Sequence, residues 1–180
     1  MFKRYADFVA KLRVPSGFML VATFAWLSRP NFPALAMGIP ISLAGLALRA
    51  WAAGHLEKNR QLTRSGPYAF VRNPLYIGTS LVAAGLVVAS QRWLLAAVFV
   101  AVFLLIYLPV IELEEQHLRS LFPDFTGYED RVPKLIPSLR PEPGVKPFRW
   151  STYRLNREYE ASLGLLAGIA FLLWKVVYLR

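Results

Sequence analysis

Residues 55–78 combine charged, amide and aromatic side chains at a density that a simple connection between two helices does not need. The stretch reads HLEKNRQLTRSGPYAFVRNPLYIG, and long apolar runs precede and follow it. Its Gly-Pro-Tyr at 66–68 and Asn-Pro at 73–74 indicate fixed turns, because proline restricts its own backbone and that of the residue before it. Rigid turns that carry many hydrogen-bonding side chains favour a binding loop.

A second group of polar residues follows the fourth apolar run of the chain. Glu114 and Glu115 stand side by side there, after a helix that is predicted to end near Leu113. Carboxylates close to a bilayer are costly unless they are paired, which favours a functional role for this pair. The alternative is a solvated helix end, with Glu112 and Gln116 on the same wet face.

These motifs resemble, in the same order, those of the integral membrane methyltransferases of the isoprenylcysteine carboxyl methyltransferase type and, more loosely, those of the phospholipid methyltransferases. The matching motifs are Gly66-Pro67-Tyr68, Arg72-Asn73-Pro74-Leu75-Tyr76-Ile77-Gly78, Glu114-Glu115 with Leu118, and Arg131-Val132-Pro133 with Pro137. The resemblance covers residues 40–138. It implies that S-adenosyl-L-methionine is the cofactor and that the methyl group goes to a lipophilic acceptor, either a prenylcysteine-like carboxylate or a lipid amine.

The resemblance also implies roles for individual residues. Arg72 and Glu115 are the predicted catalytic residues, and Glu114, the first of the acidic pair, is predicted to contact the cofactor. The other predicted cofactor-binding residues all come from the first segment: His55, Arg60, Gln61, Leu62, Thr63, Tyr68, Asn73, Pro74, Leu75 and Tyr76.

Two departures from the family pattern bear on the chemistry. Arg60 and Asn73 stand where the family often has histidine, and since an amide does not titrate near neutral pH, we expect no general base at position 73. The prenylcysteine enzymes have an arginine on the helix before the acidic pair, whereas this chain has no basic residue between Trp93 and Leu113. An amine or another apolar-tailed acceptor is therefore favoured over a carboxylate, unless Arg72 or Arg49 replaces that arginine.

Two other functions remain open from the sequence. Membrane reductases of the steroid reductase type, which use NADPH, resemble this family at the C-terminal half. They typically have a glutamate after the glycine, where this chain has Thr79 after Gly78. The second alternative is a non-catalytic membrane scaffold subunit, in which the basic loops only contact lipid headgroups.

Composition indicates a membrane protein with a single domain over residues 1–180. The chain is 56% hydrophobic and has a mean hydropathy of +0.39, which is too apolar for an ordinary soluble domain. Its net charge of +10 lies in loops beside apolar runs, so membrane lipids explain the charge better than nucleic acid. No cysteine is present, which excludes a thiol nucleophile and a cysteine-ligated zinc site, and no metal partner is expected.

The apolar runs predict an all-α integral membrane fold with about five transmembrane helices, since about 20 residues cross a bilayer. The five runs are Val14–Ser28, Ala34–Gly54, Leu75–Ser90, Trp93–Leu113 and Leu163–Leu179. A kink is predicted at Pro109. Lysine and arginine concentrate in the N-terminal segment and in the loops after the second and fourth runs, which predicts that the N-terminus and both motif segments are cytosolic. A cofactor pocket is then expected between segments 55–78 and 112–138.

The C-terminal third begins with a predicted proline-rich connector over residues 138–150. Aromatic and basic residues alternate in the stretch that follows, which is typical of a short helix on the headgroup layer. An ordinary loop is the alternative interpretation of that stretch. The last transmembrane helix is predicted at about residues 162–179.

Overall fold

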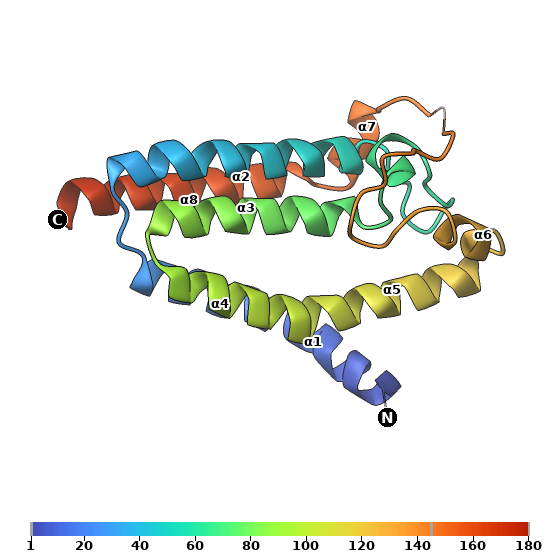
Figure 1. Ribbon diagram of the computed structural model, residues 1–180, viewed down its shortest axis with the longest axis horizontal. Helices are drawn as coiled ribbons and strands as arrows, with labels where there is room; N and C mark the ends of the chain where they lie inside the picture. The colour runs from blue at the N-terminus through green and yellow to red at the C-terminus, as the bar shows by residue number, and fades with distance from the viewer. Residues whose placement is uncertain (1, 145, 180) are drawn as a thin grey trace.

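The computed structural model describes residues 2–144 and 146–179, and it describes side chains from residue 11 onward except at 13 and 14 and at the masked position 145. All regular structure in the described ranges is helical, which confirms the predicted all-α class (Figure 1). The elements are α1 (Phe2–Leu27), α2 (Phe32–Ala53), the 3-10 helix η1 (Gly66–Ala69), α3 (Pro74–Ser90), α4 (Trp93–Val102), the π-helical turn η2 (Phe103–Tyr107), α5 (Leu108–Leu121), α6 (Phe125–Glu129), α7 (Trp150–Leu155) and α8 (Tyr159–Tyr178).

Three of these helices are long and apolar enough to cross a membrane, which makes the chain a multi-pass membrane protein. They are α2, the continuous helix Trp93–Leu121 that joins α4, η2 and α5, and α8. Two shorter apolar helices, Pro15–Leu27 within α1 and Pro74–Ser90, accompany them. The prediction of about five transmembrane helices stays a prediction for these two.

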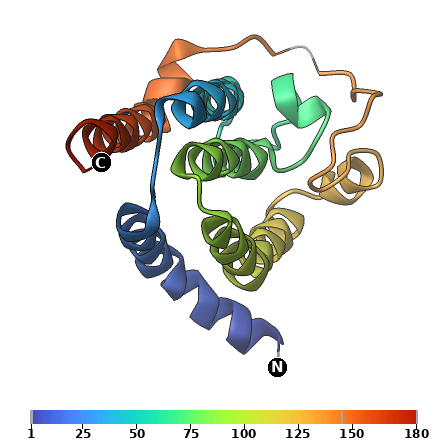
Figure 2. The same cartoon turned by 60° about the vertical axis from the view of Figure 1, so that its left-hand side comes forward.

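The long helices run lengthwise side by side, and the motif segments gather with α6 and α7 at one end of the bundle (Figure 1). We call this end, which holds residues 54–73 and 122–150, the motif end. Helices α2, α3 and α8 form one group, and α1 lies along α4 and α5 on the other side (Figures 1 and 2).

Glycines bring α2 and α3 into backbone contact. Gly38, Ser42 and Gly45 of α2 face Gly78 and Gly85 of α3, so small residues recur along both sides of the contact. A Cβ atom added at position 45 would lie 2.6 Å from the carbonyl oxygen of Gly78. Such seams of small residues let membrane helices approach closely and gain packing energy. This contact fixes α3 against α2. It thereby also fixes the end of residues 54–73, called here the motif loop, where the loop leads into α3.

We predict that Gly45→Ala lowers the stability of the protein in detergent by about 1–3 kcal/mol, the usual cost of forcing extra atoms into a packed interface. Backbone atoms of α3 form the obstacle, and they cannot rotate away. Gly164→Ala in α8 is the matched control, since an added Cβ there meets nothing within 4 Å. Thermal unfolding followed by tryptophan fluorescence should show a lower melting temperature for Gly45→Ala only. Equal melting temperatures for Gly45→Ala and Gly164→Ala would contradict the close contact between α2 and α3.

The predicted kink at Pro109 takes the form of a π-helical turn, which ends two residues before the proline. The N–H group of Leu108 donates to the carbonyl oxygen of Phe103, five residues back. A wider turn accommodates the proline ring, which clashes with a regular helical turn before it. Figure 1 shows α4 and α5 meeting at a shallow angle there.

The prediction that the helix ends near Leu113 is wrong, because α5 continues to Leu121. Glutamate, glutamine, leucine and arginine all favour helix, and this sequence continues with them until Phe122-Pro123. The acidic pair therefore lies inside a helix, where neighbouring side chains point about 100° apart.

Candidate functional site

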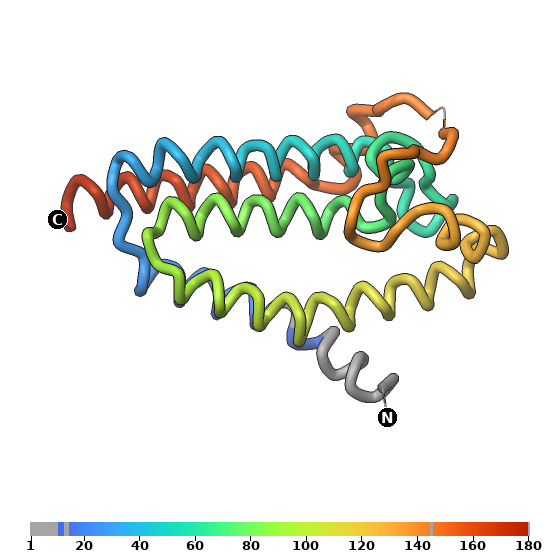
Figure 3. The backbone as a smooth tube through the Cα atoms, in the orientation of Figure 1, coloured from blue at the N-terminus to red at the C-terminus, as the bar shows by residue number. Residues whose placement is uncertain are grey.

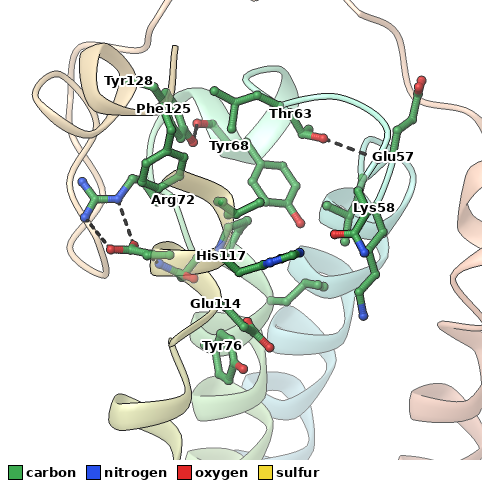
Figure 4. A pocket seen from close by; sticks show the side chains of 18 of the residues that line it. Glu57, Lys58, Thr63, Tyr68, Arg72, Tyr76, Glu114, His117, Phe125 and Tyr128 are labelled. Carbon is green, nitrogen blue, oxygen red and sulfur yellow. Dashed lines mark hydrogen bonds and ion pairs between the residues drawn. The ribbon is translucent and has the colours of Figure 1, made fainter. Parts of the chain in front are cut away.

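A cavity of about 690 Å³ opens at the motif end, between residues 56–63, η1, the start of α3, and α5 with α6 (Figure 4). Its volume lies within the range of small-molecule sites, about 300–1,000 Å³. The cavity brings together most of the predicted site residues: Gln61, Leu62, Thr63, Tyr68, Arg72, Asn73, Pro74, Leu75, Tyr76, Glu114 and Glu115. What these side chains bind stays a prediction.

Arg72 and Glu115 form a buried bidentate ion pair between the motif loop and α5. The Nε and Nη2 atoms of Arg72 donate to the two carboxylate oxygens of Glu115, at 3.0 Å each. Asn73 donates from Nδ2 to the same carboxylate at 2.9 Å, and Lys134 Nζ lies 3.2 Å from it. Glu115 is only 1% exposed, so the pair is shielded from water.

The third nitrogen of Arg72 is also engaged by protein. Nη1 donates to the carbonyl oxygens of Glu129 and Val132, at 2.8 and 2.7 Å. All three side-chain nitrogens of Arg72 are thus hydrogen-bonded within the fold. The pair ties the loop, α5 and the segment after α6 together, and its geometry favours positioning over direct contact with a reactant. The predicted catalytic role of Arg72 and Glu115 stays a prediction.

Glu114 points in a different direction from its neighbour. It lines the cavity, as does His117, which follows three residues later on the same face of α5 (Figure 4). Tyr107 of η2 lines the same cavity, and its ring packs edge-on against Tyr76 of α3 at a centroid distance of 6.1 Å. Neither His117 nor Tyr107 was predicted from the sequence, although the spacing of three residues between Glu114 and His117 places both on one face of a helix.

Two buried tyrosines form the wall of the cavity opposite α5. The Tyr128 hydroxyl donates to the backbone carbonyl of Tyr68 at 2.7 Å, which joins α6 to η1. Burial raises the pKa of Tyr68 and of Tyr128 well above the ordinary value, so both hydroxyls stay neutral at physiological pH. They offer aromatic surface and neutral hydrogen-bonding groups to a ligand.

His55 and Arg60 lie outside the lining of this cavity, so their positions do not support the predicted cofactor contacts. His55 is buried against the turn at Gly66, whose φ of +60° suits glycine, and its Nδ1 lies 3.1 Å from Ser65 Oγ. Burial lowers the pKa of His55, so the ring is neutral at pH 7. The His55 ring packs against the motif loop at Gly66, outside the cavity lining. Arg60 is exposed and lines a separate shallow hollow beside Phe122.

Residues 133–142 do more than connect helices, because they form backbone hydrogen bonds with residues 69–72 of the motif loop, which they lie beside (Figure 3). Arg72 N donates to the carbonyl of Pro133 at 2.9 Å, Ser138 N donates to Phe70 at 2.8 Å, and Glu142 N donates to Ala69 at 2.9 Å. Residues 133–142, called here the cover, hold the loop in shape, and the predicted connector over residues 138–150 overlaps the cover only at 138–142.

The amino-acid sequence of the chain matches a known protein family. The sequence model of the phospholipid methyltransferase family matches residues 33–124, half of the chain. The chain belongs to the phospholipid methyltransferase family. This confirms the resemblance seen in the motifs. Every predicted site residue falls within the match, whereas the cover and α7 lie beyond it.

Two curated proteins are similar to this family member. The cobalt-zinc-cadmium resistance protein CzcN of Cupriavidus metallidurans is 35% identical over 105 residues, which cover 57% of the chain and 47% of the relative. The nickel-cobalt-cadmium resistance protein NccN of Alcaligenes xylosoxydans xylosoxydans is 31% identical over 116 residues, 63% of the chain and 53% of the relative. The chain thus spans about half the length of these relatives. No solved structure matches the chain.

Within the described ranges, no three histidine, cysteine, aspartate or glutamate residues are grouped so that they could hold a metal ion.

Proposed function

We propose that this protein is an integral membrane methyltransferase that transfers the methyl group of S-adenosyl-L-methionine to a lipophilic acceptor at the membrane surface. The family to which it belongs is a methyltransferase family. The observation that carries the proposal is the cavity at the motif end, where acidic, basic and aromatic side chains from within the family match line one space.

The donor set of the cavity fits the cofactor. S-adenosyl-L-methionine presents an ammonium group, a carboxylate, a ribose diol and an adenine, and it supplies a methyl group already activated on a sulfonium centre. In the proposal, Glu57 and Glu114 receive the ammonium group and the diol, while Lys58 receives the carboxylate. Tyr68 and Leu62 offer flat and apolar surface for the adenine.

The residues of this chain then have to orient the two reactants and keep water from the contact, because the methyl donor needs no further activation. The Arg72–Glu115 pair holds the loop in the shape that lines the cavity. On the side toward the helices, Tyr107, Val110 and Leu113 provide apolar lining for the acceptor. In the proposal, the acceptor enters laterally from the bilayer.

The acceptor is proposed to be a lipid amine or another group with an apolar tail. A carboxylate acceptor would have to use Arg49, because Arg72 is fully engaged. Arg49 lines the cavity and pairs with Glu158 at 2.5 Å, and its Nη2 donates no hydrogen bond within the described residues.

The proposed topology has five transmembrane helices with the motif end in the cytosol. Basic loop residues concentrate at that end, which follows the positive-inside rule. They are Lys58, Arg60, Arg64, Arg72, Arg131, Lys134, Arg140, Lys146 and Arg149. The turns at the opposite end carry Arg29 and Arg92.

We predict that S-adenosylhomocysteine, the demethylated product, raises the melting temperature of the purified protein with the concentration dependence of a ligand that binds only the folded state. NADPH at the same concentrations should have no effect. A shift with NADPH alone would favour the reductase alternative. The absence of a shift with either ligand, in protein shown to be folded, would favour the scaffold alternative.

A further inference from the structure

We infer that α7 and its flanking residues form a binding surface for the headgroups of anionic phospholipids, and that this surface supports the loop lining the cavity. The surface, called here the α7 surface, consists of Arg149, Trp150, Arg154, Leu155 and Arg157. The lipid contact stands independently of the proposed function, whereas the support of cofactor binding rests on it.

Hydrogen bonds hold α7 at the level where the bundle meets the membrane boundary. Helix α2 ends at Ala53, and α8 begins only a few residues after α7. Asn156 donates from Nδ2 to the carbonyl oxygens of Ala53 and Leu56, at 2.9 Å each, and Arg149 N donates to Gly54 at 3.0 Å. Figure 1 shows α7 beside the C-terminal end of α2. Since α7 is fixed to the end of one apolar helix and precedes the next, we place it at headgroup depth.

The apolar part of the α7 surface is directed outward. Trp150 is 66% exposed and Leu155 is 72% exposed. The Trp150 ring packs edge-on against Phe148 and Tyr153, with centroid distances of 5.0 and 5.7 Å. Aromatic residues with one free side at this depth are typical of membrane interfaces.

The charge of the α7 surface is positive and selects anionic lipid. Glu158, the nearest acid on the α8 side, is buried and paired with Arg49, so it adds no negative charge to the outer face. Arg149 and Arg157 each have one acidic partner, Glu57 and Glu160. Arg154 takes part in none of the ion pairs within the described residues. Clustered arginines at a membrane surface attract phosphatidylglycerol or phosphatidylserine headgroups.

The α7 surface is physically joined to the motif loop. The Phe148 ring occupies the space beside Gly54 and lies edge-on to His55 at a centroid distance of 6.2 Å. His55 in turn supports the turn at Gly66. Lys146 donates a hydrogen bond to Gln61, which lines the cavity. Lipid that holds α7 in place therefore steadies the loop on which cofactor binding is proposed to depend.

The lipid contact is tested by depth measurement, for which the absence of native cysteine is convenient. Trp150→Cys and, separately, Leu155→Cys are labelled with an environment-sensitive fluorophore in nanodiscs that contain brominated lipids. Quenching is expected at both positions, and it should be stronger when the discs contain phosphatidylglycerol. Thr126→Cys, an exposed position on α6 at the far motif end, is the control and should stay unquenched. An absence of quenching at both α7 positions would overturn the lipid contact and favour a protein partner.

The coupling is tested by S-adenosylhomocysteine affinity in nanodiscs with and without phosphatidylglycerol. The affinity should be higher with the anionic lipid, and Arg154→Gln should reduce that gain by up to about fivefold, the value for one surface arginine. Arg140→Gln, which removes the same charge from an exposed position outside both the α7 surface and the predicted site, should leave the gain intact. Equal affinity in both lipids would overturn the coupling alone. Failure to bind the ligand in any lipid, with quenching preserved, would refute the proposed function and leave the lipid contact standing.

Discussion

Glu115→Ala is expected to destabilise the motif end by about 3–5 kcal/mol, because it leaves the Arg72 guanidinium buried without its counter-charge. Arg72 has little access to water in its place between the loop and α5. The loop should detach from α5, and the melting temperature in detergent should fall. Hydrogen exchange should rise over residues 66–73 and 129–134, where the hydrogen bonds of Arg72 and Asn73 are lost.

Glu112→Ala is the matched control for this prediction. Glu112 lies one turn earlier on the same helix and contacts Lys134 and Arg119, but it is partly exposed. Removal of such a pair costs about 0–1 kcal/mol. The combined variant Arg72→Met with Glu115→Leu should be less destabilised than the sum of its single changes, since neither charge is then stranded. Equal losses of stability for Glu112→Ala and Glu115→Ala would contradict the prediction that the buried Arg72–Glu115 pair matters more than a partly exposed one.

Glu114→Gln should weaken the binding of S-adenosylhomocysteine by about 1.5–3 kcal/mol, roughly 10- to 150-fold, if its carboxylate accepts a hydrogen bond from the ligand's ammonium group. The change keeps the size of the side chain and removes only its charge. Glu114 lines the cavity, so the binding constant should change, and the melting temperature without ligand serves as the check that the variant is folded. Isothermal titration with the purified protein provides the measurement.

Glu112→Gln is the appropriate comparison here, because Glu112 is paired with Lys134 at 2.6 Å outside the cavity lining. Its effect on ligand affinity should be small. If Glu114→Gln and Glu112→Gln weakened binding equally, the affinity would depend on the overall charge of α5 and not on a contact with Glu114. If neither did, the ammonium group would lie elsewhere, with Glu57 as the remaining acid of the cavity outside the buried pair.

The all-α class, the apolar helices and the family of this protein could be predicted from its amino-acid sequence. Each of these depends on local properties: the length of an apolar run, the position of proline, and the order of short motifs. The helix Trp93–Leu121 illustrates the limit, since its existence was predicted correctly but its end was misjudged by eight residues. Nothing in the apolar pattern marks where a helix stops once it has left the lipid.

How the polar residues divide their tasks could not be predicted from the sequence, because it depends on how the helices pack. Glu114 and Glu115 are identical in type and adjacent, yet rotation about the axis of α5 turns one into the cavity and buries the other against Arg72. His117, for which no role was predicted, lines the cavity, whereas His55, which was predicted to contact the cofactor, packs against the turn at Gly66. The small-residue seam between α2 and α3, and the cover over the motif loop, join residues far apart in the chain. Such contacts depend on how helices pack and turn relative to one another, which no local pattern encodes.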